Sequence, residues 1–389
     1  MIARMAEALA SNDCVRVAVF PHYTSNPYTT RLIDELNGRG YDARGFKASK
    51  SIGLELLRSF RPHVAHVQWV EKQMVRATPD ETRRTAARFL WQVRALRLLG
   101  VKVVWTLHNL ASHDSPDPEL EREVTNRFAG RVDAAIAHCG RAAELATQRF
   151  AALRDKPIAV AMHPGYAGVY GDAPSKAEAR ARLSLEPDVP VVLSLGQIRS
   201  NKGLDALVRE FVKLRDGGAG EARLVIAGSG VHEEAVAALR EAAAGRADVR
   251  IDDRFLDDAE LPTYLAAADV FVAPYTRSLT SGAVLLAMTY GLPCVAPDEA
   301  CLGEVLSAQG ELLYMPDEAN GLAEALSRAF AMRNRWAAWG EANAQRAAGW
   351  TWGSFVDGVE TAYRSAGVAT PSCPASGRWP AAPGAIAAP

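Results

Sequence analysis

Short apolar runs alternate with longer helical patterns along nearly the whole chain, and this alternation restricts the folds open to it. In the first half, apolar runs at 15–20, 64–67, 101–106 and 134–137 predict strands, and residues 29–39 predict a helix. Strands that are apolar throughout are typical of parallel sheets, which helices cover on both faces. The sequence therefore predicts an α/β fold.

The same alternation restarts after a loop rich in Gly and Pro. Strands are predicted at 189–195, 223–227, 249–251 and 269–273, with helices at 203–215, 232–244, 258–267 and from 282 onward. The second series is the more regular, which favours two doubly wound Rossmann-like domains facing a cleft over one large sheet. The expected parts are an N-terminal domain at 1–170, a C-terminal domain at 186–345, a last helical segment at 346–366 and a disordered Pro-rich tail at 367–389.

Composition excludes several classes of function. The chain has 389 residues, with 44 basic and 45 acidic side chains, so no overall field attracts nucleic acid and no nucleic-acid partner is expected. The five cysteines form no CxxC pair, which argues against a zinc site or a disulfide framework. The sequence shows no signal pattern and no apolar run of the roughly 18–20 residues that span a bilayer, so we expect a cytoplasmic protein.

Two strand-to-helix junctions in the second half carry groups that suit an anion. One follows the strand at 189–195 and the other follows the strand at 269–273. Ligands of open α/β sheets bind beyond the carboxyl ends of the strands. Cations at one junction, with hydroxyls and helix N–H groups at the other, form a cradle for a diphosphate. The candidate donor-binding residues are Gly196, Arg199, Lys202, Tyr275, Thr280, Ser281 and Gly282.

Each of these residues also has a structural interpretation. Arg199 or Lys202 alone fits a solvated position at a helix start, and Ser281 fits an N-cap. The two junctions taken together favour the cradle. The segment IAGSG at 226–230 is interpreted as a tight turn. Arg254 is a further donor-binding candidate, proposed to contact the nucleotide base. This assignment rests only on its position after a strand.

Three loops after strands of the first half are rich in side chains that can transfer protons. Imidazoles and carboxylates at strand ends suit proton removal from a sugar hydroxyl. A metal site is the rival interpretation, but HxxxxH without partnered Cys or HExxH is poor ligand spacing. Any single histidine here also fits a structural hydrogen bond. The candidates are Glu71, His108 and Asp114 for catalysis, and Asn26, Tyr28, Trp69 and Asn109 for the acceptor site.

The segment TRRTAARFLWQVRALRLLGVK, residues 82–102, holds six basic residues and no acid. At the helical period of about 100° per residue, Phe89, Val93 and Leu96 form a narrow core-facing stripe. Most basic residues fall on the other side, interleaved with Trp91, Leu98 and Leu99. Such a face suits peripheral contact with an anionic membrane through residues 83–102, and it equally fits a solvated helix.

Five segments together resemble a known group: NPYTTRLIDEL, HVQWVE, TLHNLASHD, GQIRSNKGL and APYTRSLTSGAVLLAMTYGLPCVAP. They span residues 26–297 and resemble the GT-B nucleotide-sugar glycosyltransferases, more narrowly the bacterial β-mannosyltransferases that extend lipid-linked exopolysaccharide of the xanthan type. The resemblance implies a nucleotide diphosphate sugar donor, best GDP-mannose, bound in the second domain without a metal or other cofactor. It implies a glycan or lipid-linked acceptor, a last helix that crosses back to the first domain, and contacts from Arg199 and Lys202 to the donor diphosphate.

The sequence departs from the broader retaining GT-B pattern at an acidic pair. Ser278 and Leu286 stand in its places, so ribose recognition must differ, and the usual acidic contact to the donor sugar is missing. The SG…LLA version agrees with the mannosyltransferase group, whose inverting chemistry uses direct displacement with a general base. By position the base is Glu71, Asp114 or His108, and we favour Glu71 because it follows the tryptophan of the motif.

Two other functions stay open from the sequence. A nucleotide-sugar 2-epimerase shares the architecture and would form product without an acceptor. A catalytically silent partner subunit would keep the scaffold for assembly at the membrane, and the missing acidic pair is the best argument for it. It would have no affinity for GDP or UDP.

Overall fold

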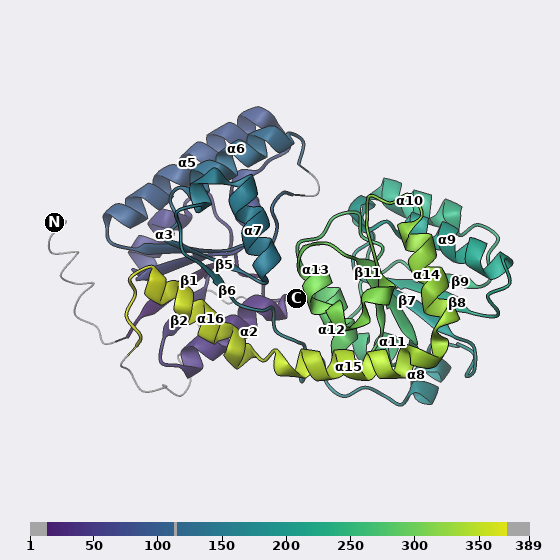
Figure 1. Cartoon of the computed structure of the whole chain (residues 1–389). Helices are drawn as coiled ribbons and strands as arrows, with labels where there is room; N and C mark the ends of the chain where they lie inside the picture. The colour runs from purple at the N-terminus through teal and green to yellow at the C-terminus, as the bar shows by residue number, and fades with distance from the viewer. Residues whose placement is uncertain (1–13, 113–114, 372–389) are drawn as a thin grey trace. The chain divides into compact units, whose positions relative to one another are not determined.

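The computed structural model describes residues 14–112 and 115–371 (Figure 1). The chain forms two compact units: unit 1 contains the residues up to His163 and those from Trp352 onward, and unit 2 is Pro164–Thr351. Each unit holds one six-stranded sheet in which every strand pair is parallel. The predicted class, α/β with two doubly wound domains, is therefore confirmed.

The sheet of unit 1 has the strand order β2-β1-β3-β4-β5-β6. Its strands are β1 (Arg16–Phe20), β2 (Asp42–Gly45), β3 (Val64–Val67), β4 (Lys102–Thr106), β5 (Ala134–Ala137) and β6 (Ile158–Val160). Because β1 lies between β2 and β3, the chain order reverses between β1 and β3, and a topological switch point opens beyond their carboxyl ends. The loops after these two strands carry several of the candidate residues.

Helices cover both faces of this sheet. They are α2 (Pro27–Gly38), α3 (Ile52–Ser59), α4 (Glu71–Met74), α5 (Pro79–Leu98), α6 (Pro118–Ala129), α7 (Gly140–Arg149), the 3-10 turn η1 (Ala151–Leu153) and α16 (Trp352–Ser365). Figure 1 shows α5 and α6 side by side. The last helix, α16, packs on α2, β5 and β6, so the chain returns to unit 1 as expected.

The sheet of unit 2 has the order β12-β11-β10-β7-β8-β9. Its strands are β7 (Val191–Leu195), β8 (Arg223–Ala227), β9 (Val249–Asp252), β10 (Val270–Val272), β11 (Cys294–Pro297) and β12 (Leu313–Tyr314). The central neighbours β7 and β10 are the first and fourth strands of this unit, so the switch point lies between them. Both predicted anion-binding junctions begin at these two strands.

The helices of unit 2 enclose a core built on Phe211, Val270 and Trp339. They are α8 (Lys176–Arg182), α9 (Leu204–Asp216), α10 (Glu233–Ala242), α11 (Leu261–Ala267), α12 (Gly282–Thr289), α13 (Ala300–Val305), α14 (Gly321–Ala331) and α15 (Trp336–Gly349), with 3-10 turns η2 (Ser200–Lys202), η3 (Ser307–Leu312) and η4 (Arg333–Arg335). Most of α12 is buried, which explains why its sequence is apolar on every side.

The chain passes between the units at 163–164 and again at 351–352. The second passage lies between α15, which belongs to unit 2, and α16. Val368, inside the stretch expected to be a tail, still packs in the core of unit 1, and residues 372–389 of that stretch lie outside the described residues. Among the described helices, none combines the length and the apolar character that crossing a membrane requires.

Candidate functional site

The loops after β7 and β10 in unit 2 are joined directly. Lys202 ends the 3-10 turn that follows β7, and its ammonium nitrogen lies 3.6 Å from the centre of the Tyr275 ring. The Tyr275 hydroxyl is 3.2 Å from the Ser281 hydroxyl at the start of α12. Thr276 donates its backbone N–H to the carbonyl oxygen of Asn201 at 3.2 Å. The structure therefore brings the cation of one junction to the helix start of the other.

Close packing between the two loops requires a glycine after Lys202. Gly203 has φ of 60°, and a Cβ atom placed there would lie 2.2 Å from the carbonyl oxygen of Pro274. A side chain would therefore force the turn away from β10. Gly203 therefore lets the turn that carries Lys202 pack against the end of that strand.

Ser281 caps α12, as the structural interpretation of this residue predicts. Its Oγ accepts a hydrogen bond from the N–H of Val284 at 3.3 Å, and the side chain is buried. The next residue, Gly282, has a packing role: a Cβ atom there would meet the Tyr166 hydroxyl at 2.6 Å. Capping does not exclude anion binding, because a cap satisfies one N–H of the first turn and the helix start keeps its positive potential.

The segment between Tyr275 and Ser281 is held by the N-cap residue and the first turn of α13, which follow β11. Glu299 accepts a hydrogen bond from the N–H of Ser278 at 2.9 Å, and Cys301 donates its N–H to the carbonyl oxygen of Leu279 at 3.1 Å. Thr280 accepts a bond from the Ser278 hydroxyl through its carbonyl oxygen, at 3.0 Å. Glu299 thus supplies a carboxylate beside Ser278. This role could not be recognised from the sequence, because Glu299 stands among other turn residues.

The remaining donor-binding candidates are placed differently. Gly196 directly follows β7 and donates its N–H to the carbonyl oxygen of Ala227 at 3.0 Å. Arg199 is half-buried at the start of the same 3-10 turn as Lys202. Arg254 follows the edge strand β9, and its guanidinium group makes two bonds to the Glu260 carboxylate, at 2.9 and 2.6 Å. Arg254 is therefore engaged on the surface at the sheet edge.

In unit 1, Tyr28 and Asn26 belong largely to the framework. Asn26 caps α2 by accepting a bond from the N–H of Tyr28 at 3.0 Å. The Tyr28 ring is buried in the core among aromatic and imidazole rings, and its hydroxyl is 3.4 Å from Nε2 of His138. Both residues follow β1, as predicted, and the Asn26 side-chain oxygen and the Tyr28 hydroxyl have partners within unit 1.

Glu71 lies at the first residue of α4, after β3. Burial raises the pKa of its carboxyl group to about 7, and the charge of Glu121 adds to this effect. A hydrogen bond from the Asn109 side chain and the charge of Lys72 act in the opposite direction. Glu71 and Asn109, predicted separately from two loops, are therefore in direct contact. A carboxylate with a pKa near neutrality is suited to accept a proton.

His108 is buried next to Glu71's loop and is stacked on Trp69, with ring centres 4.3 Å apart. Its Nε2 donates to the side-chain oxygen of Gln68 at 2.8 Å. Burial holds the pKa of His108 well below its usual value, and the neighbouring His138 and His163 lower it further. A neutral, hydrogen-bonded imidazole with a low pKa is a weak base. Asp114, the third catalytic candidate, lies outside the described residues.

A second buried carboxylate in unit 1 was missed. Glu121, in the first turn of α6, accepts bonds from the N–H and the hydroxyl of Ser112, at 2.7 and 2.8 Å. These two bonds anchor the loop that contains Asn109. An acid in the first turn of a helix is ordinarily explained by the helix dipole, so the sequence offered no signal for this role. Among residues 14–112 and 115–371, no group of three or more His, Cys, Asp or Glu side chains is arranged to hold a metal ion.

Comparison with solved structures gives many proteins of the same fold. Sucrose-phosphate synthase from Thermosynechococcus elongatus matches with a TM-score of 0.71 at 18% identity and covers 90% of this chain and 98% of that chain. Anabaena HepE, solved in complex with UDP and glucose, matches with a TM-score of 0.68 at 13% identity, over 90% of this chain and all of that one (100%). At these identities the likeness is one of fold.

Sequence comparison identifies the family. Residues 189–332 match the family model described as glycosyl transferases group 1. A D-inositol 3-phosphate glycosyltransferase from Nocardia farcinica is 30% identical over 68% of this chain, which spans 62% of that protein's length. A lipopolysaccharide core biosynthesis mannosyltransferase from Rhizobium meliloti is 30% identical over 63% of this chain and 67% of that protein. The chain belongs to the group 1 family of glycosyltransferases and has their two-domain GT-B fold.

Proposed function

We propose that the protein transfers a hexosyl group from a nucleotide diphosphate sugar to a hydroxyl group of a lipid-linked or polysaccharide acceptor in cell-surface glycan synthesis. GDP-mannose is the proposed donor. The mannosyltransferase relative supports mannose, and the departures from the retaining GT-B pattern at Ser278 and Leu286 support the same group of enzymes. The names of the relatives give different substrates, so the identities of the donor and the acceptor are proposals.

The observation that carries the proposal is the contact chain from Lys202 through Tyr275 to Ser281. When the bond from the anomeric carbon to the diphosphate breaks, negative charge builds on the departing oxygen. A lysine ammonium and the N–H groups at the start of α12 are suited to stabilise that charge because they are held in place before the reaction. We assign Arg199 and the backbone of Thr280–Gly282 to the same diphosphate, and Gly196 to the turn that admits it.

We propose that Glu71 takes up the proton from the hydroxyl group of the acceptor substrate. Its raised pKa, about 7, lets the carboxyl group take up a proton and release it near neutral pH. Asn109 orients the carboxylate, and we assign the half-buried Trp69 to contact with a sugar ring. The hydroxyl oxygen attacks the anomeric carbon, its proton passes to Glu71, and the nucleoside diphosphate leaves with the electrons of the broken bond.

We place the protein at the inner face of the cell membrane, where a lipid-linked acceptor would be presented. The basic face of α5, predicted from residues 83–102, supports this placement. Contact between α5 and the membrane is part of this proposal.

Lys202→Ala tests the assignment directly. We expect the release of nucleoside diphosphate, measured with GDP-mannose and a lipid-linked acceptor, to fall by about 100-fold or more, as for loss of one fixed donor to a developing anion. Lys213→Ala is the matched control, because Lys213 is an exposed lysine that pairs with Glu210 on α9. Equal activity of the Lys202 variant would refute the donor site, and conversion of the donor sugar without acceptor would indicate an epimerase.

A further inference from the structure

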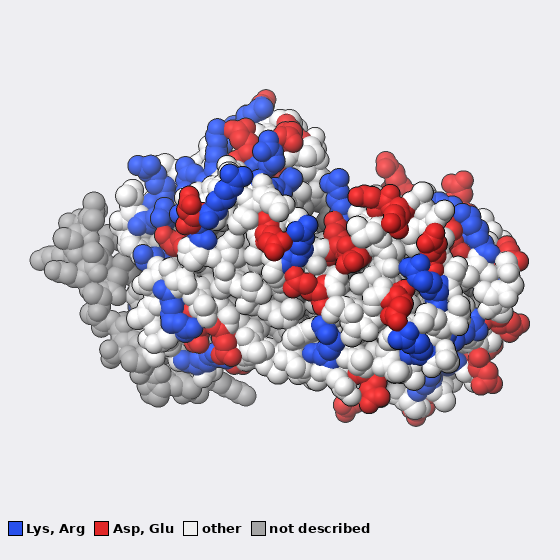
Figure 2. Space-filling view, viewed as in Figure 1, with Lys and Arg blue, Asp and Glu red and all other residues white. Residues whose placement is uncertain are grey.

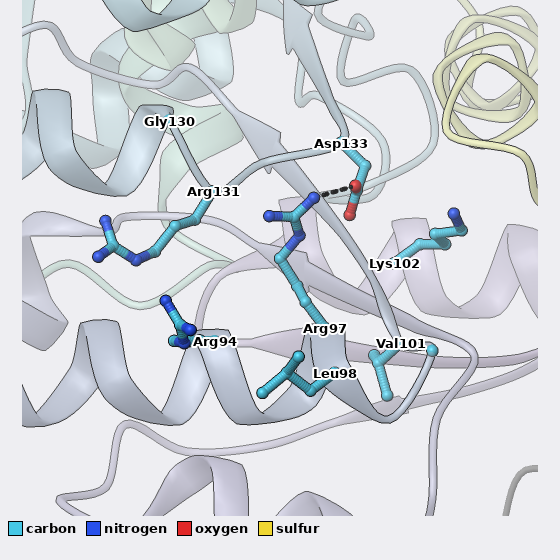
Figure 3. Close-up of a pocket in the computed structure, with 9 residues that line it drawn as sticks. Arg94, Arg97, Leu98, Val101, Lys102, Gly130, Arg131 and Asp133 are labelled. Atoms are coloured by element: carbon cyan, nitrogen blue, oxygen red, sulfur yellow. Dashed lines mark hydrogen bonds and ion pairs between the residues drawn. The ribbon is translucent and has the colours of Figure 1, made fainter.

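A basic hollow lies in unit 1 at the amino ends of β4 and β5, opposite the strand ends that carry the candidate site. It has a volume of about 560 Å³ (Figure 3). Two arginines come from the last turns of α5, one from the turn after α6, and one lysine from the start of β4. The charged lining residues are Arg94, Arg97, Lys102, Arg131 and Asp133.

Positive charge exceeds negative charge inside this hollow. Asp133, its one acid, accepts bonds from Arg97 and from the N–H of Val103, both at 2.8 Å. Within the described chain, Arg94 and Lys102 form no ion pair, and the bond made by Arg131 goes to the carbonyl oxygen of Arg127. Burial lowers the pKa of Arg131, and the charges of its arginine neighbours lower it further. A bound anion would relieve this repulsion.

The exposed face of α5 leads into the hollow. Arg84, Arg88, Trp91 and Leu98 are spaced by four, three and seven residues, which places them on one face of the helix. Trp91 is 68% exposed and Leu98 is 72% exposed, whereas the opposite stripe of Phe89, Val93 and Leu96 is buried as predicted. Leu98 also lines the hollow. A single patch thus combines apolar side chains with arginines and the basic hollow.

The charge of this patch selects its partner. The chain as a whole has a net charge of −1, so the excess is local, and Figure 2 shows Lys and Arg gathered over the part of unit 1 formed by α5 and α6. An exposed tryptophan and leucine between arginines match the interface of an anionic bilayer, where aromatic rings lie at headgroup level and cations contact phosphates. An acidic protein surface would match the arginines and leave the apolar side chains without a function.

We propose that the hollow binds the phosphate group of an anionic phospholipid while Trp91 and Leu98 enter the membrane interface beside it. Its volume is within the usual range for small-ligand pockets, which suits a glycerophosphate headgroup. The site extends the membrane contact predicted from residues 83–102, because Arg131 and Asp133 come from a different part of the sequence. It does not depend on the assignment of donor or acceptor.

Binding of the full chain to vesicles tests the hollow. Mixed phosphatidylglycerol–phosphatidylcholine vesicles should bind the protein, and pure phosphatidylcholine vesicles should not. The double variant Arg94→Gln/Arg131→Gln should bind about 25-fold more weakly, because each basic residue near an anionic surface contributes a factor of about five. Arg209→Gln/Lys213→Gln removes the same charge from exposed positions of α9 and should lower binding less than about two-fold. Thermal melting should not fall in the Arg94/Arg131 variant, because the substitutions remove mutually repelling charges.

A second measurement reports on insertion beside the hollow. Lipids brominated in the acyl chain quench a tryptophan that enters the interface, so they should quench the wild type and not Trp91→Phe, which keeps an aromatic ring and should keep binding. Equal binding by the Arg94/Arg131 variant and the α9 control would overturn the proposal. Equal binding to neutral and anionic vesicles would also overturn it. So would saturable binding of inorganic phosphate together with no binding to anionic vesicles.

Discussion

Glu71 carries the first prediction at the scale of single residues. A general base works only when deprotonated, so with a pKa of about 7 the rate should rise about tenfold per pH unit below neutrality and level off above it. Glu71→Gln should lower kcat/KM by about 10²–10⁴-fold and lose the rising limb. The measurement is kcat/KM against pH, which reports the pKa values of the free enzyme.

Two further variants sharpen this test. Asn109→Ala removes a hydrogen bond that lowers the pKa of Glu71, so the rising limb should move to higher pH. Glu119→Gln, at an exposed acid of α6, should leave the profile where it is. If the Glu71→Gln enzyme shows the same rise of rate with pH as the wild type, another group is the base. The low pKa of His108 makes that histidine a poor substitute.

Residue types at strand ends could be recognised from the sequence, but their partners could not. The pairing of Glu71 with Asn109 joins two loops whose contact depends on the strand order of the sheet. Glu121 and Glu299 were missed because each reaches its loop by a hydrogen bond between segments, which no local pattern encodes. Asn26, in contrast, was assigned to an acceptor site although its position before Pro27 is typical of an N-cap.

At the scale of elements, most inner strands and the edge strand β9 were predictable from the sequence, whereas the other described edge strands and the inner strand β11 were not. The strands at 64–67, 134–137 and 223–227 have the predicted bounds because both of their faces are apolar. β2, β6, β11 and β12 were missed. β2 lies at a sheet edge, where Asp42 and Arg44 pair with each other at 2.8 Å, and β6 is a short edge strand that is only half-buried. Edge strands need not be apolar, so a search for apolar runs can pass over them, as it does for β2 and β6.

The start of α12 supports a prediction about packing. Alanine at position 282 would suit the helix, but its Cβ would lie 2.6 Å from the hydroxyl of the buried Tyr166. We expect Gly282→Ala to lower the free energy of unfolding by about 1–2 kcal/mol, since overpacking outweighs the gain in helix propensity. Urea unfolding measures this difference.

A double-mutant cycle identifies the cause. Without the hydroxyl, the nearest ring atom lies 3.6 Å from the new Cβ, which is ordinary contact. Tyr166→Phe should therefore offset part of the cost of Gly282→Ala, with a coupling of about 1 kcal/mol. Gly349→Ala, at a helical glycine with no atom within 4 Å of the added Cβ, should be neutral or stabilising. Strict additivity of the Gly282 and Tyr166 changes would rule out the contact as the cause.

At the scale of the whole molecule, the number of domains followed from the repeated strand–helix series, whereas the path between them did not. The chain leaves unit 1 after His163 and returns at Trp352, so unit 1 is discontinuous in sequence. The return was expected from a family resemblance. Periodicity shows that residues 352–365 form a helix, but it cannot show which sheet that helix covers. Each unit has its own core, which makes a ligand of one unit separable from the other.

This separation gives a prediction for nucleotide binding. A ligand that binds only the native state stabilises it, by about 2.7 kcal/mol at 100 times its Kd, so GDP should raise the melting temperature of the full chain more than UDP does. Hydrogen exchange with GDP present should slow in the segments 196–203 and 275–283 of unit 2. Lys202→Ala should lose most of both effects, whereas Lys213→Ala should keep them. Protection appearing instead in the strand-end loops of unit 1 would place the nucleotide in the other unit, because slowed exchange marks the segments that the ligand holds closed.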